Sequence, residues 1–541
     1  MIIRGQLIDI RKKRIYPAEL RLHDKKIASI REMPAGETVP QQYLCPGFID
    51  AHVHIESSML VPAEFARLAV VHGTVATVSD PHEIANVCGL DGVDFMIRNG
   101  REVPFHFFFG APSCVPATLF ETAGAALNTQ QIDELMRRPE ILYLSEMMNF
   151  PGVLNGDPEV MEKIASARKY QKPVDGHAPG LRGADAKKYI DAGISTDHEC
   201  FTAGEALEKL QYGMKIIIRE GSAARNFEAL VPLLHEHWEN MMFCSDDKHA
   251  DSLVQGHINQ LCARSVNRGI DLFKVLQVAC VNPVNHYKLN VGQLRIGDAA
   301  DFIILKDLEK FDVLRTFVNG ECVADNGKTK IQSPVFTRHI NHFQCDPVSA
   351  DMLHCPATTA IYPDPVIEAL DGQLITGKST DQPQWRYGNW ETDISRDILK
   401  IVVINRYKKA RVARAFIKNF GLKTGAIASS VAHDSHNIVA VGVQDGDIAR
   451  AANLVISEKG GISAVGLGRE MKLALPVAGL MTASDGYQTA KNYTDLDALA
   501  KELGSGLRAP FMTLSFMALL VIPHLKLSDL GLFDGDRFNL L

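Results

Sequence analysis

The sequence of 541 residues lacks a CxxC pair, a long apolar run and any excess of positive charge. Its ten cysteines are scattered, so neither a disulfide framework nor a zinc site of paired cysteines is expected. We predict reduced thiols in a cytoplasmic protein, because the N-terminus also lacks the apolar stretch of a signal peptide. A formal net charge of −7 provides no basic surface for nucleic acid.

The most apolar stretch, residues 511–522, is too short to cross a bilayer, which needs about 20 apolar residues. Pro523 follows it, so a buried helix is the better interpretation and no membrane contact is expected. What remains is an ordinary globular composition, with 46% hydrophobic and 22% charged residues. At roughly 150 residues per domain, the length predicts two to four structural units.

Apolar, strand-like runs alternate with amphipathic helical stretches through the first half of the chain. The runs are residues 47–54, 73–80, 104–113, 141–147, 173–178, 194–199, 215–220 and 241–247. Such alternation predicts a parallel sheet, and eight strands within roughly 250 residues are typical of a closed (β/α)8 barrel. The predicted fold class is therefore α/β, with a metal-dependent hydrolase-type TIM barrel over residues 46–291.

Short strand patterns with polar or Gly-Asp turns flank the predicted barrel, in residues 1–45 and 292–340. Because short strands need partners and chain ends often lie close together, we expect both segments to form one small composite β-sandwich. A polar, proline-containing stretch follows, which indicates a boundary near residue 345. Residues 345–541 are predicted to form an additional C-terminal α/β domain.

Side chains that can bind metal stand at the predicted C-terminal ends of five barrel strands. Barrel enzymes keep their active sites at this end. The first strand ends in His52-Val53-His54, and side chains two apart in a strand point the same way. Other strand ends supply Glu146, His177, His198 and Asp246. Each alone is more often a hydrogen-bonded rim residue, but the six together favour a metal site.

Two cations fit these six residues better than one. A mononuclear catalytic zinc site typically has three protein ligands. Two cations close together need a bridging anion, which Glu146 can supply, and water between them becomes hydroxide near neutral pH. Histidine and carboxylate ligands without thiolate suit manganese, iron or zinc.

Several long motifs are spread over nearly the whole chain. They are PGFIDAHVHIESSM, SDPHEIANVCG, EMMNFPGVL, DGHAPGL, STDHE, REGSAARN, CSDDKHADSLVQGHI, INRY and GAIASSVAHDSHNIVAVG. These motifs resemble the adenine deaminase family of the amidohydrolase superfamily. Many superfamily members bridge their cations with a modified lysine, whereas the matching strand end here has Glu146, as expected of this family.

The resemblance implies hydrolysis of adenine to hypoxanthine and ammonia by a hydroxide that bridges two manganese or iron ions. It implies one cation on His52, His54 and Asp246, the other on His177 and His198, and Glu146 as the bridge. Asp246 is expected to act as general base and then as general acid. The family likeness also suggests a homo-oligomer.

Six further polar residues are candidates for contact with the purine. They are Glu56, His82, Glu83, Glu199, His433 and His436. The first four are candidate donors of the proton that the ring nitrogen beside the reacting carbon needs. His82 and Glu83 also fit a helix N-terminus. Strand alternation turns Glu199 away from the lumen unless the strand has ended.

The two histidines belong to a polar string, residues 430–437, that admits three interpretations. It closes over the barrel mouth, binds a further metal, or forms a hydrogen-bonded turn between two strands.

Two other assignments fit the sequence less well. The triplet His54-Ile55-Glu56 matches the start of a zinc base-deaminase signature, but the second part, P-C-x-x-C, is absent. The alternative within the superfamily is a hydrolase of another cyclic amide or aminopurine. The missing bridging lysine and the long C-terminal domain argue against it, and a non-catalytic relative would have lost ligands.

Overall fold

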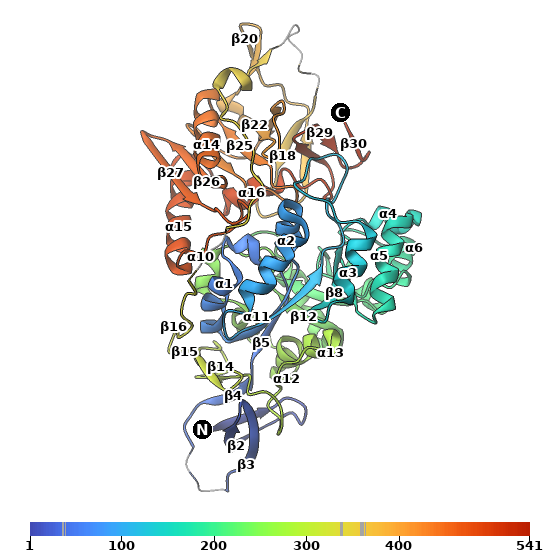
Figure 1. The fold of residues 1–541 in the computed structure, drawn as a ribbon, viewed down its shortest axis with the longest axis vertical. Helices are drawn as coiled ribbons and strands as arrows, with labels where there is room; N and C mark the ends of the chain where they lie inside the picture. The colour runs from blue at the N-terminus through green and yellow to red at the C-terminus, as the bar shows by residue number, and fades with distance from the viewer. Residues whose placement is uncertain (35–36, 38, 336–338, 357–361, 363) are drawn as a thin grey trace.

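The computed structural model describes residues 1–541 except 35–36, 38, 336–338, 357–361 and 363. Eight parallel strands form its centre (Figure 1). They are β5 (Phe48–Val53), β6 (Thr74–Ser79), β7 (His106–Ala111), β8 (Ile141–Met147), β9 (Val174–Gly176), β10 (Thr196–Asp197), β11 (Lys215–Arg219) and β12 (Met241–Cys244). Strands β5 to β9 pair in sequence, as do β10 to β12.

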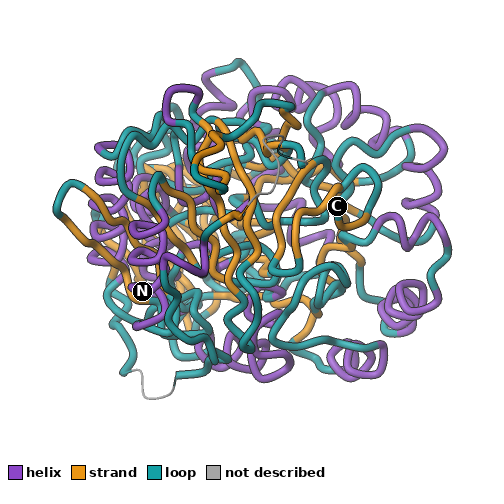
Figure 2. Tube along the Cα trace, turned by 90° about the horizontal axis from the view of Figure 1, so that it is seen from above, coloured by secondary structure: helices purple, strands orange, loops and turns teal. Residues whose placement is uncertain are grey.

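Single bridges join these two groups of strands, between Val174 and Ile194 and between Val53 and Asp246. The strands therefore close into the predicted (β/α)8 barrel. Nearly all residues of these strands are buried, and apolar side chains alternate along them with polar ones such as Asp50, His52 and Thr77. Viewed from above, strands fill the middle of the molecule and helices lie around the outside (Figure 2).

Most barrel helices follow a strand directly, as the sequence pattern predicts. The helices of this region are α1 (Pro62–Ala69), α2 (His82–Gly100), α3 (Thr129–Arg137), α4 (Phe150–Asn155), α5 (Pro158–Lys169), α6 (Gly183–Asp191), α7 (Ala203–Gln211), α8 (Phe227–Leu230), α9 (Leu234–His237), α10 (Ala250–Gln255), α11 (Ile258–Asn267), α12 (Leu272–Leu276) and α13 (Asn282–Tyr287).

Strands from before and after the barrel pair in one sheet of order β16-β15-β14-β13-β4-β1-β2-β3. They are β1 (Ile2–Asp9), β2 (Arg14–His23), β3 (Lys26–Glu32), β4 (Tyr43–Pro46), β13 (Phe302–Leu305), β14 (Val313–Val318), β15 (Glu321–Asp325) and β16 (Lys328–Thr329). The link is β4, which pairs with β1 on one side and with β13 on the other. Both ends of the barrel thus feed the same small β unit.

A second eight-stranded sheet of order β19-β18-β23-β22-β25-β24-β26-β27 organises the C-terminal part. Its strands are β18 (Val366–Ala369), β19 (Thr376–Ser379), β22 (Ile398–Ile404), β23 (Ala413–Lys418), β24 (Ala426–Ser429), β25 (Ile438–Gly442), β26 (Gly461–Gly466) and β27 (Arg469–Ala474). Only β18 and β23 pair in parallel. Helices α14 (Asp445–Ser457), α15 (Gly486–Glu502) and α16 (Pro510–Phe516) complete this part with two small sheets.

The apolar stretch at residues 511–522 contributes α16, which is fully buried but ends at Phe516. Across the described ranges, no helix is both long and apolar enough to cross a membrane. The C-terminal part also contacts the barrel directly: Leu60 forms a bridge with Thr482, and Glu64 accepts the backbone N–H of Gly486.

Candidate metal centre

Three of the predicted ligands meet at the junction of the first and last barrel strands. His52 and His54 come from the end of β5, and Asp246 lies just beyond β12. The two imidazole Nε2 atoms are 3.1 Å apart, and Asp246 Oδ1 lies 3.4 Å from the first and 3.2 Å from the second. All three side chains are buried.

The other three predicted ligands meet beside them, with Glu146 in the middle. Its Oε1 is 3.1 Å from His54 Nε2. Its Oε2 is 2.7 Å from His177 Nδ1 and 3.2 Å from His198 Nε2. One carboxylate oxygen therefore faces each half of the cluster.

Electrostatics explain how these groups stay together in a buried place. Burial opposes ionisation of Glu146, but the imidazoles of His177, His198 and His54 hold the pKa of its carboxyl well below the usual range. Burial also opposes ionisation of Asp246, whose pKa is nevertheless held well below its usual range by Arg219 and His52. Both carboxyl groups are thus ionised, as ligands of a cation must be.

Arg219, at the end of β11, is a functional residue that the sequence reasoning missed. Its guanidinium contacts Asp246 Oδ2 at 2.6 Å and both oxygens of Glu199. The available signal was its position: it is the first charged side chain after three isoleucines, at the strand end where barrel side chains face the site.

Glu199 faces the cluster after all, because β10 ends at Asp197 and the alternation rule stops applying. Its Oε1 lies 3.4 Å from His198 Nε2 and 3.6 Å from His177 Nδ1. Glu56 is placed differently. One of its oxygens accepts the backbone N–H of Ile84 at 3.2 Å, and burial raises the pKa of this carboxyl to about 7.

The string 430–437 is a loop between β24 and β25, and it also reaches the barrel mouth. His433 Nδ1 contacts one oxygen of Glu83, and His436 Nε2 contacts the other. Burial opposes both charges, but the imidazoles hold the pKa of Glu83 well below its usual range, and the pKa of His433 is raised to about 9. The string is therefore a loop between two strands that also contacts the barrel mouth through Glu83.

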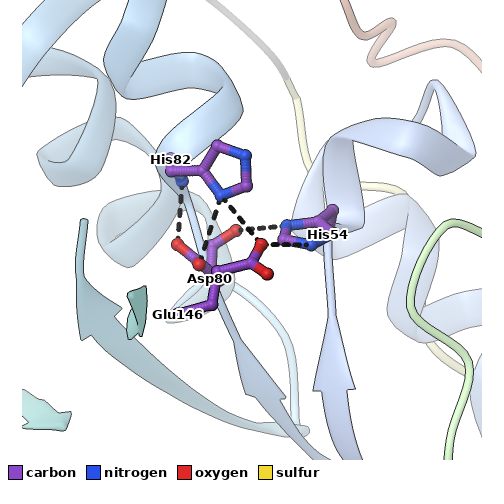
Figure 3. Close-up of side chains that lie close together, drawn as sticks. All are labelled: His54, Asp80, His82 and Glu146. Atoms are coloured by element: carbon purple, nitrogen blue, oxygen red, sulfur yellow. Dashed lines mark hydrogen bonds and ion pairs between the residues drawn. The ribbon is translucent and has the colours of Figure 1, made fainter. Parts of the chain in front are cut away.

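His82 begins α2, as the helix N-terminus interpretation predicts, and its side chain also lies beside the cluster. Its Nδ1 is 3.2 Å from Asp80 and 3.6 Å from Glu146 Oε1. Figure 3 shows His82, Asp80, Glu146 and His54 converging. On its other side, His82 Nε2 lies 3.5 Å from Glu83 and 3.5 Å from Asp434.

The pocket over the cluster has walls from both halves of the chain. Its barrel residues are His54, His82, Glu83, Glu146, Met148, His177, His198, Glu199, Arg219, Asp246 and Asp247. Its C-terminal residues are Leu374, His433, Asp434 and Leu519. Glu56 and His436 do not line the pocket. His436 contacts the pocket residue Glu83.

The donor set fits two divalent cations. His52 Nε2, His54 Nε2 and Asp246 Oδ1 are 3.1–3.4 Å apart, roughly the edge of a tetrahedron around a cation with bonds of about 2.1 Å. Two imidazole nitrogens that face each other repel unless a proton or a cation lies between them. The two oxygens of Glu146 then suit one cation each.

Comparisons with known proteins identify the family of the chain. Residues 43–323 match the amidohydrolase family, and residues 373–539 match the adenine deaminase C-terminal domain. The chain is 53% identical over 545 residues to an adenine deaminase of Sulfurovum sp. (strain NBC37-1), covering 100% of this chain and 99% of that protein.

Two further relatives are named adenine deaminase. The protein of Salinibacter ruber is 54% identical over 539 residues, with 99% of this chain and 98% of that protein covered. The protein of Methanosarcina mazei is 50% identical over 545 residues, with 99% and 98% covered. The chain therefore belongs to the adenine deaminase family of the amidohydrolases.

Proposed function

We propose that this chain uses the buried histidine–carboxylate cluster to hydrolyse adenine to hypoxanthine and ammonia. It is an amidohydrolase-family hydrolase, and its relatives across the full length are adenine deaminases. The observation that carries the chemistry is the position of Glu146, whose two oxygens face His54 on one side and His177 and His198 on the other.

The proposed ligands of the first cation are His52, His54 and Asp246. Those of the second are His177 and His198, with Glu146 shared by both. Such cations polarise a bound water and lower its pKa toward neutrality. We propose manganese or iron, with zinc compatible with the same donors.

The proposed roles of the protein groups follow from their contacts. Asp246 lines the pocket, and we assign it the role of accepting the proton of the attacking water and passing it to the departing ammonia. Arg219 donates to Asp246 Oδ2 at 2.6 Å and so fixes the orientation of this carboxylate. Glu199, beside His177 and His198, is the predicted purine-contact residue nearest the second cation position.

The remaining proposed contact residues form the roof of the site. Glu83 and His82 lie at the N-terminus of α2, and His433 lines the pocket from the C-terminal loop. His436 supports Glu83, and Glu56 supports the start of α2 through Ile84.

Ammonia release from adenine by the manganese-loaded protein tests the function, with adenosine, cytosine and dihydroorotate assayed in parallel. Asp246→Asn should lower kcat by about 100- to 10,000-fold, because the proton acceptor is lost. Metal content should stay near two per chain. Asp191→Asn, at an exposed position on α6, is the matched control.

No turnover of adenine by fully loaded protein would exclude adenine as the substrate and favour another cyclic amide or aminopurine. Loading the metal-free protein separately with manganese, iron and zinc tests the metal assignment. Light scattering tests the proposed homo-oligomer.

A further inference from the structure

Two neighbouring polar groups in the pocket have unused hydrogen-bonding capacity. His82 Nε2 lies 3.5 Å from Asp434 Oδ1. Among the residues that the structure describes, neither His82 Nε2 nor Asp434 Oδ2 has a hydrogen-bond partner. Both side chains are only 3% exposed, so bulk water does not satisfy them. Buried polar atoms are nearly always paired, so an unpaired donor and acceptor that face a pocket indicate a ligand.

A third cation is a poor occupant of this place. His82, Glu83 and Asp434 lie close enough together to hold one. However, Glu83 contacts His433 with one oxygen and His436 with the other, so a cation bound to Glu83 would compete with both contacts. Without Glu83, only one nitrogen and one carboxylate remain, which is fewer than the ligands a protein-bound cation usually has.

The pair instead matches an edge of the purine. An imidazole N–H donates and a carboxylate oxygen accepts, so the complementary edge has a ring nitrogen beside an N–H group. Adenine has three such edges: N1 with the 6-amino group, N7 with the 6-amino group, and N3 with N9–H. The 6-amino group must face Asp246 and the cations, because its bond to C6 is the one that breaks. The edge left for His82 and Asp434 is N3 with N9–H.

We propose that His82 donates to N3 of adenine and that Asp434 accepts from N9–H, which makes the site selective for the free base. This inference rests on the proposed adenine deamination and deepens it. In adenosine, N9 carries ribose, so Asp434 loses its donor and meets the sugar instead. A site built to bind a donor rejects an analogue without it more strongly than an apolar pocket does, because a buried polar group is left unpaired.

The site's construction explains why two parts of the chain are needed for this recognition. His82 is fixed at the start of α2, where its Nδ1 faces Asp80 and Glu146. Asp434 is fixed on the C-terminal loop by its neighbour His433, which contacts Glu83. Leu374 and Leu519 line the same pocket and offer apolar surfaces to the faces of the ring.

The experiment compares adenine with 9-methyladenine, which lacks the N9–H, in the wild type, Asp434→Ala and Asp434→Asn. Affinities of the products hypoxanthine and 9-methylhypoxanthine are measured as well, because they need no turnover. Asp434→Ala should lower kcat/KM for adenine and the affinity for hypoxanthine by about 10- to 100-fold. Values for the methylated compounds should change by less than about twofold. Asp434→Asn keeps an acceptor oxygen, so its kcat/KM for adenine and its affinity for hypoxanthine should lie between those of the wild type and Asp434→Ala.

Several results would overturn the inference. One is an equal loss on adenine and 9-methyladenine in Asp434→Ala, which would indicate a merely structural role. Another is a wild type that accepts both bases equally well. A loss of one metal per chain in either variant would assign Asp434 to a cation. If Asp434→Ala does not fold, the comparison uses Asp434→Asn alone. A wild type with little preference for adenine over 9-methyladenine, and the same preference in Asp434→Asn, would then contradict the inference. Absence of ammonia release from adenine in the wild type is a different result, since it removes the proposed function itself.

Discussion

At the residue scale, the site depends on buried charges that compensate each other. Arg219 is the clearest case, because one buried guanidinium contacts carboxylates from two different strand ends, Glu199 and Asp246. Removing one partner of such a group leaves an uncompensated buried charge, which typically costs 3–5 kcal/mol. Arg219 therefore contributes both to the stability of the protein and to the orientation of Asp246, the proposed general base.

The sequence shows some of these residues and hides others for a physical reason. His52 and His54 could be predicted because a strand has a period of two, which is a local rule. Their geometry agrees with that rule. Arg219 and Asp434 could not be ranked, because their importance comes from partners far away in the chain. For Asp434 that partner is His82, on another domain.

Glu121 provides a prediction on pH and stability. Its carboxyl is buried, accepts from Thr118 Oγ1 at 3.2 Å, and has its pKa raised to about 8, chiefly by burial and then by the charge of Asp434. In the unfolded chain a glutamate titrates near 4.3. The folded state thus binds more protons between these values, so stability falls as pH rises from about 4 to about 8.

Glu121→Gln removes this ionisation, so its stability relative to wild type should grow over the same interval and level off above pH 8. Urea midpoints at pH 5, 6, 7 and 8 measure it. The exposed Glu321→Gln is the control. Parallel pH curves for wild type and Glu121→Gln would contradict the prediction.

At the element scale, the ends of strands decide where side chains point. The short β10 ends at Asp197, and Asp197 then accepts the backbone N–H of Glu199 at 3.0 Å. The chain bends there, which turns both His198 and Glu199 toward the cluster. Periodicity predicts the strand but not the residue at which it stops, so the orientation of Glu199 stayed open in the sequence.

Packing between β7 and β8 gives a prediction on a glycine. A Cβ on Gly110 would lie 2.2 Å from Ser145 Oγ and 2.7 Å from the Tyr143 ring, both on the next strand. Gly110→Ala should therefore lower the free energy of unfolding by about 1–3 kcal/mol. Gly204→Ala, in α7 with open space around it, should be neutral or stabilising by about 0.5–1 kcal/mol. Equal urea midpoints for the two variants would contradict the prediction, because β7 and β8 would then accommodate the added methyl group at no cost in stability.

At the scale of the whole molecule, the fold class followed from the sequence and the arrangement of its parts did not. Eight strand-like runs with intervening helices are a repeated local signal, and the barrel confirms the prediction. The contact of Glu83 with His436 joins residues 353 positions apart. No local pattern encodes such a distance, which is why contact of the 430–437 loop with the site was one interpretation among three.

Metal removal gives the prediction for the whole molecule. The proposed ligands lie on or just after β5, β8, β9, β10 and β12 and share one small volume, so bound cations would tie the barrel together at its mouth. Each site saturated at about 100 times its Kd should add about 2.7 kcal/mol to the stability of the folded chain. The melting temperature should drop on chelation and recover with added manganese.

Glu146→Gln should show a smaller recovery in the same titration, because the proposed bridging group loses its negative charge and one of its two ligand oxygens. Identical melting of metal-free and loaded wild-type protein would contradict the assignment.

The position of residues 430–437 in the chain means that the two parts of the site are translated at different times. Domains of a growing chain generally fold from the N-terminus first. The barrel can thus leave the ribosome and close well before the loop that holds Glu83 and carries Asp434 has been translated. A chain that stops short of residue 437 would carry every proposed cation ligand yet lack the roof. A prematurely terminated chain would therefore keep the proposed metal-binding residues but lack His436, which supports Glu83.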